Sequence, residues 1–469
     1  MSAIVFGTDG WRGVIGDDFT FANVRRVVRA IARYVNQTTP RKPVLTVGYD
    51  TRFGSPEFAR VAAETLSQQG IEVLLSNDYV ASPILSFAVR HFRTAGGIMI
   101  TASHNPAHWN GVKFKGTYGG SANPAIIRSI EKLLPASDRE TAGVSSRRPQ
   151  GKIRVIDFKR PYREHLKRTI DFKKLRNARV RVIVDAMYGA GRGTLRTILS
   201  DLGIVCQEIR GEINPSFGGV HPEPIESNLA ELRAALQRTQ FDVGFASDGD
   251  ADRIGAMDGS GLFVDSHKIF SMILEHLVAT RQMKGEVAKT FSSTKMIDQI
   301  CRRFSIPMHE TPIGFKYICD LMLTRKILIG GEESGGIGVT RHLPERDSVL
   351  CALLMLEIMI TRKKTLREVV SDLMRQYGSF YFDRLDLHLT EAQKQRAVRR
   401  LTHQPPRKIS NYAVARLERL DGFKFLFSDT EWVLVRPSGT EPILRLYCEA
   451  SSPQKVKRIL TAAKNLVSA

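Results

Sequence analysis

The chain has 469 residues, 42% of them hydrophobic and 25% charged, and its 69 basic and 48 acidic residues give a net charge of +21. This length favours about three domains. The chain has no run of about 18 apolar residues, so no membrane span is predicted. The first residues, MSAIVFGTDGWRG, lack the basic and apolar regions of a signal peptide. The basic residues are spread along the chain without a nucleic-acid-reading motif, so the charge favours small anionic substrates over nucleic acid.

The five cysteines are scattered and form no C-x-x-C pair. This usage argues against a disulfide framework and against a zinc site, and it favours a reducing compartment. We therefore expect a cytoplasmic protein, a monomer or a homodimer, with no membrane and no nucleic-acid partner.

Three stretches of the chain repeat one plan, in which an apolar run leads into a polar loop and then into a helical pattern. They are PVLTVGYDTRFGSPEFARVAAETL from residue 43, VRVIVDAMYGAGRGTLRTIL from 180 and EVAKTFSSTKMIDQICRRF from 286. Short second strands are predicted at 71, 204 and 306, and a further apolar run then opens onto TASHNP, SDGDADR or GEESGG. The pattern predicts three similar α/β domains with largely parallel sheets, each presenting one loop at the carboxyl edge of its sheet to a central cleft.

The last hundred residues differ from these repeats. EWVLVRPSGTEPILRLYCEA, from 431, reads as strand, loop and strand, and a helical stretch closes the chain at about 453–467. We predict a smaller α+β domain here, with domain limits at 1–145, 146–256, 257–372 and 373–469, and we expect the last domain to close through a hinge near residue 373.

TASHNP places Ser103 at the end of an apolar strand, beside His104. A serine needs activation or a good phosphoryl donor to react, and the G-x-S-x-G elbow of acyl-transfer enzymes is absent. By itself the hexapeptide also fits a turn with a structural hydroxyl.

SDGDADR alternates Asp248, Asp250 and Asp252 with small residues. Alternate side chains of an extended loop point the same way, so three carboxylates can converge on Mg²⁺. The calcium loop of an EF-hand does not fit, because its sixth position is Arg253 and its twelfth is Gly259. A metal site is favoured over an acidic surface turn, and together with Ser103 it favours phosphoryl transfer.

Three glycine-containing loops remain. RPSGTEP, from 436, offers a guanidinium, hydroxyls and backbone N–H groups, which favours phosphate binding over a plain hairpin turn. GEESGG, from 331, has acceptors suited to sugar hydroxyls, although many such loops have no function. GTDGWRG, from 7, places Arg12 in a turn that is either structural or a further phosphate ligand.

With these motifs in this order from end to end, the chain resembles the α-D-phosphohexomutase superfamily. The resemblance implies four domains around a central cleft, a phosphoserine at Ser103, and Mg²⁺ held by a phosphoserine oxygen with Asp248, Asp250 and Asp252. It also implies a role in catalysis or substrate binding for further residues: Arg12, His104, Lys113, Arg253, Lys289, Gly314, Glu332, Ser334, Arg436, Ser438, Gly439 and Thr440.

The resemblance also suggests a branch of the family. Glu-Glu-Ser in GEESGG and the segment ETPIGFKYI resemble phosphoglucomutases, although Ile313 and Phe315 depart from the usual Thr-Pro-Thr-Gly-Trp-Lys, and RPSGTEP also resembles the glucosamine branch. The implied reaction interconverts hexose 1-phosphate and hexose 6-phosphate, glucose preferred, with glucose 1,6-bisphosphate as intermediate and activator. Lys113, helped by His104, is expected to act as acid and base, its pKa lowered by nearby cations.

Three alternatives remain open. A phosphomannomutase or phosphoglucosamine mutase of the same family would share every motif. A metal-dependent sugar phosphatase would share Ser103 and the aspartates but release phosphate, and an inactive sensor of sugar phosphates would need neither.

Overall fold

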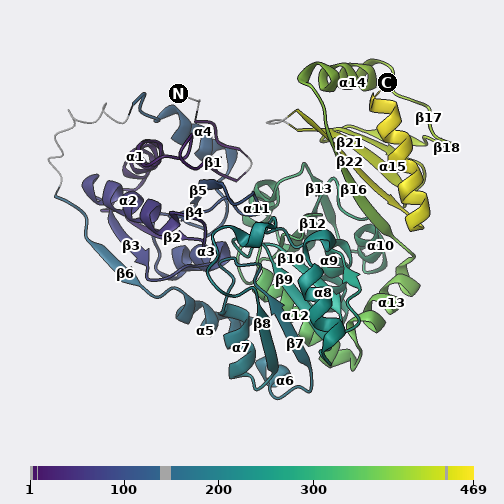
Figure 1. Cartoon of the computed structure of the whole chain (residues 1–469), viewed down its shortest axis with the longest axis horizontal. Coiled ribbons are helices and arrows are strands. Elements are labelled where there is room, and N and C mark those ends of the chain that lie inside the picture. Colours follow the sequence, from purple (N-terminus) through teal and green to yellow (C-terminus); the bar gives the residue numbers. More distant parts are fainter. Residues whose placement is uncertain (1–3, 8, 138–148, 439–441, 469) are drawn as a thin grey trace.

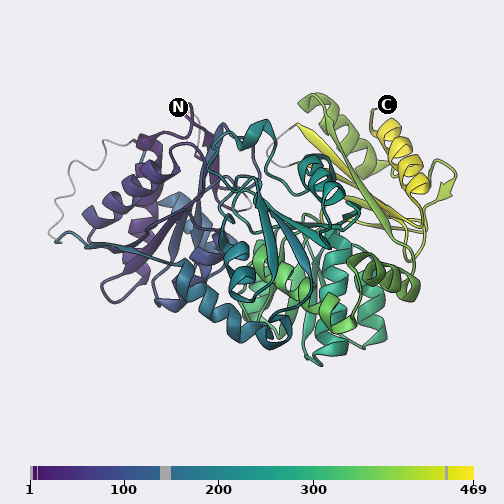
Figure 2. The same ribbon diagram turned by 60° about the horizontal axis from the view of Figure 1, so that its bottom comes forward.

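The computed structural model describes residues 4–7, 9–137, 149–438 and 442–468 (Figure 1). The first domain is drawn in purple and blue at one end of the molecule, and the C-terminal domain in yellow-green stands at the other (Figures 1 and 2). No helix within the described ranges combines the length and apolar character needed to span a bilayer.

The first domain is a sheet covered by helices, with strand order β1-β5-β4-β2-β3-β6. Strands β4, β2, β3 and β6 run parallel, while β5 is antiparallel to both of its neighbours. Its elements are β1 (Trp11–Val14), α1 (Phe21–Thr38), β2 (Val44–Tyr49), α2 (Ser55–Gln68), β3 (Glu72–Ser76), α3 (Ser82–His91), β4 (Gly97–Ile100), β5 (Trp109–Lys115), α4 (Pro124–Lys132) and β6 (Ile153–Ile156).

The second domain repeats this plan, with strand order β11-β10-β9-β7-β8. Strands β8, β7 and β9 are parallel and β10 is antiparallel to β9. Its elements are α5 (Lys159–Thr169), α6 (Phe172–Leu175), β7 (Arg181–Asp185), α7 (Thr194–Asp201), β8 (Val205–Ile209), α8 (Ala230–Arg238), β9 (Val243–Ser247), β10 (Ile254–Asp258) and β11 (Phe263–Val264).

The third domain has the order β13-β12-β14-β15, in which only β15 is antiparallel to its neighbour. Its elements are α9 (Ser266–Glu275), β12 (Glu286–Thr290), α10 (Met296–Arg303), β13 (Met308–Thr311), α11 (Phe315–Thr324), β14 (Ile327–Gly331), β15 (Ile337–Val339), α12 (Ser348–Arg362) and α13 (Leu366–Tyr377). In all three domains the polar loop therefore joins a parallel strand to its antiparallel neighbour, which confirms the predicted repeat.

The last domain is the predicted α+β unit, with an antiparallel sheet in the order β16-β22-β21-β20-β19. Its elements are β16 (Tyr381–His388), α14 (Glu391–His403), β17 (Lys408–Ile409), β18 (Tyr412–Ala413), β19 (Arg416–Glu418), β20 (Phe423–Leu426), β21 (Trp432–Pro437), β22 (Ile443–Ala450) and α15 (Pro453–Ser468).

The sheets also bear on the domain limits. β6 lies beyond residue 145 but pairs with β3, and β11 lies beyond residue 256 but pairs with β10. We therefore propose domain limits that follow these two strands. Leu373 is buried inside α13, and the helix ends at Gly378, where φ is 105°. The hinge near residue 373 stays a prediction.

The first three domains share one hydrophobic core that runs from α3 and α5 to α12. Helix α12 is apolar on all sides and buried from Ser348 to Met359, as expected of a helix at the centre of a large protein. Its start is fixed by Asp347, whose side chain accepts a hydrogen bond from the Leu350 N–H at 3.0 Å. This cap also fixes the preceding residue, Arg346, which contributes to the site described below.

Candidate active site

Ser103 follows the end of β4 in a strained turn. Its φ is 55°, in the left-handed region that few residues other than glycine adopt, and its N–H donates to Thr101 Oγ1 at 2.9 Å. The side chain is 1% exposed, and its hydroxyl donates to Asp248 Oδ2 at 3.0 Å. The serine and the acidic loop, 145 residues apart in the chain, are therefore in direct contact.

The acidic loop between β9 and β10 is buried, and its three aspartates converge. One carboxylate oxygen from each of Asp248, Asp250 and Asp252 lies within 4.8 Å of the other two. Asp248 also accepts the N–H groups of Asp252 and Arg253 at 2.9 and 3.0 Å, which holds the loop in shape. At Gly249, an added Cβ would lie 2.4 Å from the Ser103 carbonyl oxygen, so only glycine lets the two loops approach this closely.

The electrostatics of these carboxylates suit a divalent cation. Burial, followed by Asp252 and Asp250, raises the pKa of Asp248 well above its usual value. Within the described residues, Asp250 Oδ1 and Asp252 Oδ1 are buried and accept no hydrogen bond. Crowded carboxylates with unpartnered oxygens are the ligand set that Mg²⁺ takes, so the residues fit the predicted metal.

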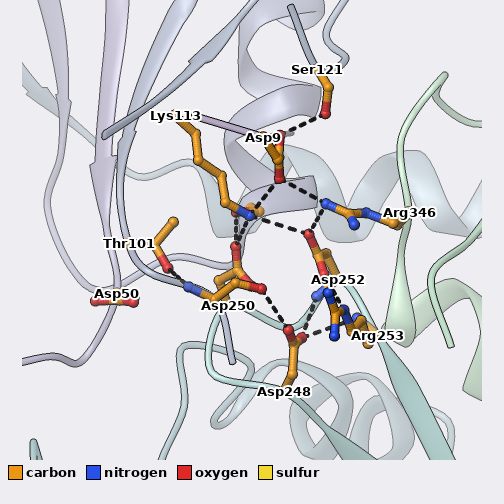
Figure 3. A network of polar contacts seen from close by, with 12 residues as sticks. Asp9, Asp50, Thr101, Lys113, Ser121, Asp248, Asp250, Asp252, Arg253 and Arg346 are labelled. Carbon is orange, nitrogen blue, oxygen red and sulfur yellow. Dashed lines mark hydrogen bonds and ion pairs between the residues drawn. The ribbon is translucent and has the colours of Figure 1, made fainter. Parts of the chain in front are cut away.

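Lys113, on β5, lies against this cluster (Figure 3). Its ammonium is 2.8 Å from Asp250 Oδ2, 2.8 Å from Asp9 Oδ2 and 3.4 Å from Asp252 Oδ2. Burial by itself would lower the pKa of Lys113, but these carboxylates outweigh burial and raise the pKa. The expectation that nearby cations lower its pKa is therefore wrong for this arrangement, because carboxylates are its nearest charges.

His104, unlike Lys113, has cations as its nearest charges. Burial, followed by Arg253, Arg12 and Lys113, lowers its pKa well below the usual value, so its imidazole is neutral at physiological pH. Its Nδ1 atom is buried and makes no hydrogen bond to any described residue. Arg12 donates to the Asn105 side chain in the same loop, and Arg253 lies 3.4 Å from Glu223.

Two residues that the sequence did not single out join the first and third domains to the acidic loop. Arg346 contacts Asp252 at 2.5 Å and Asp9 at 2.9 Å (Figure 3). It also contacts Glu332 at 3.1 Å. Asp9 also accepts a hydrogen bond from Ser121 at 2.9 Å. The GTDGWRG motif was a signal for Asp9, whereas nothing local marks Arg346, because its partners come from three domains.

The GEESGG loop reaches this cluster through Glu332. Burial raises the pKa of Glu332 to about 7, although the Arg346 guanidinium opposes that shift. Ser334 follows it as a half-buried residue in the same turn, and Gly314 lies at the start of α11 with a φ of 131°. Glu333 accepts a hydrogen bond from Thr290 at 3.0 Å.

The RPSGTEP loop lies on the last domain, between β21 and β22. The Arg436 Nε lies 3.0 Å from Asp421, Ser438 is buried, and Gly439 and Thr440 lie outside the described residues. Lys289 is not brought to the aspartates: within the described chain, its ammonium lies 3.1 Å from the Thr294 carbonyl and 3.5 Å from Glu310, and it pairs with Asp298.

Family models match each part of the chain. They are described as phosphoglucomutase/phosphomannomutase alpha/beta/alpha domain I, II and III and C-terminal domain, and they match residues 3–141, 160–261, 265–377 and 387–466 respectively. These matches cover most of the chain and follow the order of the four domains described above.

Individual relatives agree. A phosphoglucomutase/phosphomannomutase of Thermococcus kodakarensis is 28% identical, with 97% of this chain and 96% of the relative covered. A phosphoglucosamine mutase of Limosilactobacillus reuteri is 31% identical with the same coverage. A crystal structure from Thermus thermophilus, provisionally named a phosphomannomutase, is 36% identical with a TM-score of 0.88 over 100% of both chains. The chain belongs to the phosphoglucomutase/phosphomannomutase family of phosphohexomutases, and it is an isomerase of that family.

Proposed function

We propose that this mutase interconverts hexose 1-phosphate and hexose 6-phosphate, with glucose preferred, through a phosphoserine at Ser103. The observation that carries the proposal is the contact between the Ser103 hydroxyl and Asp248, at 3.0 Å, in a buried cluster of three aspartates. Metal ligands beside a hydroxyl nucleophile are recurring parts of phosphoryl-transfer sites.

Asp248, Asp250 and Asp252, with an oxygen of the phosphorylated Ser103, would hold Mg²⁺. When bound, the ion would neutralise charge on the transferring phosphoryl oxygens. Arg253 flanks the same loop and would meet that charge from the protein side. Lys113, which the aspartate carboxylates keep protonated, neutralises them and cannot accept a proton, so we assign proton acceptance to the neutral His104 imidazole.

The reaction takes two transfers. In the first, the Ser103 Oγ–P bond breaks as the sugar hydroxyl, O6 or O1, bonds to phosphorus, and the hydroxyl proton passes to the neutral His104 imidazole. The product is glucose 1,6-bisphosphate, which also primes the enzyme when added from outside. In the second, the other phosphate returns to Ser103 and the proton is given back to the oxygen it leaves.

We assign substrate binding mainly to residues of the third and fourth domains, with Arg12 from the first. Glu332, Ser334 and Gly314 would contact the sugar, while Arg436, Ser438, Gly439, Thr440 and Arg12 would serve its phosphates. Lys289 is fully buried and paired with Asp298, so we assign it no contact with substrate. The net charge of +21 favours retention of the anionic bisphosphate between transfers. The named relatives include enzymes named for mannose and for glucosamine, so they do not single out one sugar. The preference for glucose therefore rests on the Glu-Glu-Ser sequence of the 331–336 loop alone.

The test compares glucose, mannose and glucosamine 1-phosphates side by side, with MgCl₂ and the matching 1,6-bisphosphate. We expect 6-phosphate product from all active sugars, with kcat/KM highest for glucose 1-phosphate. A higher value for another hexose would transfer the assignment to that sugar. Inorganic phosphate released in step with substrate loss would instead support the sugar phosphatase.

A further inference from the structure

Arg52, between β2 and α2, has a role that neither the motifs nor the proposed reaction assigns. Its side chain is 1% exposed, and its guanidinium donates to a ring of main-chain carbonyls in the loop that carries Ser103. Nη1 donates to Pro106 and Trp109 at 2.7 and 3.0 Å, and Nη2 donates to Ser103 and Asn105 at 2.7 and 2.6 Å.

The guanidinium is itself held from two further sides. Its Nε faces Asp50 Oδ2 at 3.2 Å, as an ion pair rather than a directed hydrogen bond, and Asp50 Oδ1 accepts the Arg52 N–H at 3.0 Å. From the second domain, the ring of Phe217 lies 4.8 Å below it. Next in the chain, the Thr51 hydroxyl donates to the Tyr188 carbonyl at 2.7 Å, which fixes the segment to the second domain. The Arg52 and Thr51 side chains are therefore held in place before any substrate binds.

The Ser103 loop needs such support. Ser103 has a φ of 55°, a strained conformation that persists only where its surroundings hold it. The Ser103 carbonyl lies between the Arg52 Nη2 and the main chain at Gly249, where an added Cβ would approach within 2.4 Å. The direction of the Ser103 side chain toward Asp248 is thus tied to the position of its own carbonyl.

We propose that Arg52 is a positioning residue for phosphoryl transfer: it fixes the backbone of residues 103–109 and so aims the Ser103 hydroxyl at the aspartate cluster. A lysine cannot replace it, because an ammonium is a point donor that cannot span carbonyls bound by a planar fork. The effect of Arg52 on catalysis rests on the proposed function. The hydrogen bonds by which Arg52 holds the 103–109 loop, called the clamp below, do not depend on that function.

The test compares Arg52→Lys with Arg210→Lys as a matched control. Arg210, just after β8, is also buried and pairs at 2.8 Å with Asp185, the last residue of β7, which is the strand that corresponds to β2; its carbonyl partner is Asn228. Hydrogen exchange of peptides covering 101–110 reports on the loop, and steady-state rates with glucose 1-phosphate report on catalysis. Both are measured on the full chain after circular dichroism has established folding.

We expect Arg52→Lys to speed amide exchange in 101–110 at least tenfold and to lower kcat about a hundredfold, as for an ångström-scale misplacement. KM should change less than about threefold, because Arg52 does not touch substrate. Arg210→Lys should leave both the exchange of 101–110 and kcat unchanged. Unaltered loop exchange, or wild-type kcat, in Arg52→Lys would overturn the proposal.

Asp50→Asn keeps the Arg52 guanidinium but removes its charged partner. This variant is the second test of the clamp, for use if Arg52→Lys does not fold. It should raise exchange of the same peptides with a smaller loss of kcat, and unchanged exchange would again overturn the clamp. Loop exchange needs no substrate. A wild-type chain without mutase activity would therefore defeat the proposed function while leaving the clamp to be decided by exchange.

Discussion

Two junctions between domains differ sharply in what fills them. At the first, where domains one to three meet, buried charges face one another: Asp9, Lys113, Asp252 and Arg346 form a continuous set of ion pairs. At the second, between the third and fourth domains, aromatic and aliphatic side chains form the contact, among them Phe291, Leu426, Trp432, Leu434 and Tyr447.

The second junction also buries polar groups, and two of them have clear local partners. Lys424, fully buried, donates to the Phe291 carbonyl at 2.6 Å and lies 4.5 Å from the Trp432 ring. Glu449 accepts from the Lys295 N–H at 2.8 Å and from the Trp432 indole at 3.1 Å. The apolar area buried at this junction stabilises the position of the domain.

The difference indicates where chemistry is located. Burying many charges in one place costs stability unless each charge is paired. A cluster of buried charges is therefore typical of a site where those charges act on a ligand. The ion-paired junction holds the candidate reaction centre, and the apolar junction holds the domain that carries the Arg436 loop. Four experiments would break or sharpen this division.

Ser103→Ala should have the largest effect. With the hydroxyl removed, turnover should fall roughly 10³-fold or more, as for loss of an enzymatic nucleophile. The unfolding temperature should stay near the wild-type value, because the change removes one small side chain. A coupled assay and a thermal melt measure the two, and turnover near that of the wild type would remove Ser103 from the mechanism.

Arg346→Met should come next, through stability. It leaves Glu332 buried without the cation that pairs with it and leaves Asp9 and Asp252 with Lys113 as their nearest cation, and breaking such a network costs about 3–5 kcal/mol of the free energy of unfolding. Urea unfolding measures this cost. Arg367→Met is the control, because that arginine is 56% exposed and its pair with Asp258 should contribute about 1 kcal/mol or less. Equal costs for both variants would contradict the contrast between the junctions.

Mg²⁺ should stabilise the wild type through the aspartate cluster. At about a hundred times its dissociation constant, a bound ion adds about 2.7 kcal/mol to the free energy of unfolding. Burial, followed by repulsion from Asp252 and Asp250, raises the Asp248 pKa, so Asp248→Asn removes an unfavourable buried charge and should fold yet lose this gain. Denaturant melts with MgCl₂ and with EDTA show the difference. A full Mg²⁺ effect in Asp248→Asn would place the metal elsewhere.

Lys424 should give the second junction a measurable pH dependence. Burial lowers its pKa to about 8 in the folded chain, although Glu310 opposes the shift, and the value in the unfolded chain is near 10.5. The unfolded state then binds the proton more tightly, so the free energy of unfolding should rise by about 2 kcal/mol between pH 7 and pH 9.5. Lys424→Met should lack this component. If the free energy of unfolding changes with pH equally in the wild type and in Lys424→Met, the Lys424 ammonium is not desolvated and the prediction is wrong.

Much of the architecture was predictable because it rests on local patterns. Apolar runs followed by loops and helices gave three α/β repeats, and the alternation around 443–450 gave the antiparallel last domain. Even the weakly marked strand near 306 is present as β13. The end of α13 is marked locally only by Gly378, which follows the predicted domain limit at 373 by a few residues.

Sequence by itself determined the reactive residue types and the order in which they occur: a serine after one strand, alternating aspartates after another and a glycine-rich arginine loop near the end. Tertiary structure decided their electrical environment, because the pKa of Lys113 depends on carboxylates up to 139 residues away. It also decided the roles of Arg52 and Arg346, whose partners are carbonyls and carboxylates gathered from distant segments. Short-range chemistry can be read along a chain, whereas Coulomb forces and hydrogen bonds depend on distances that only folding sets.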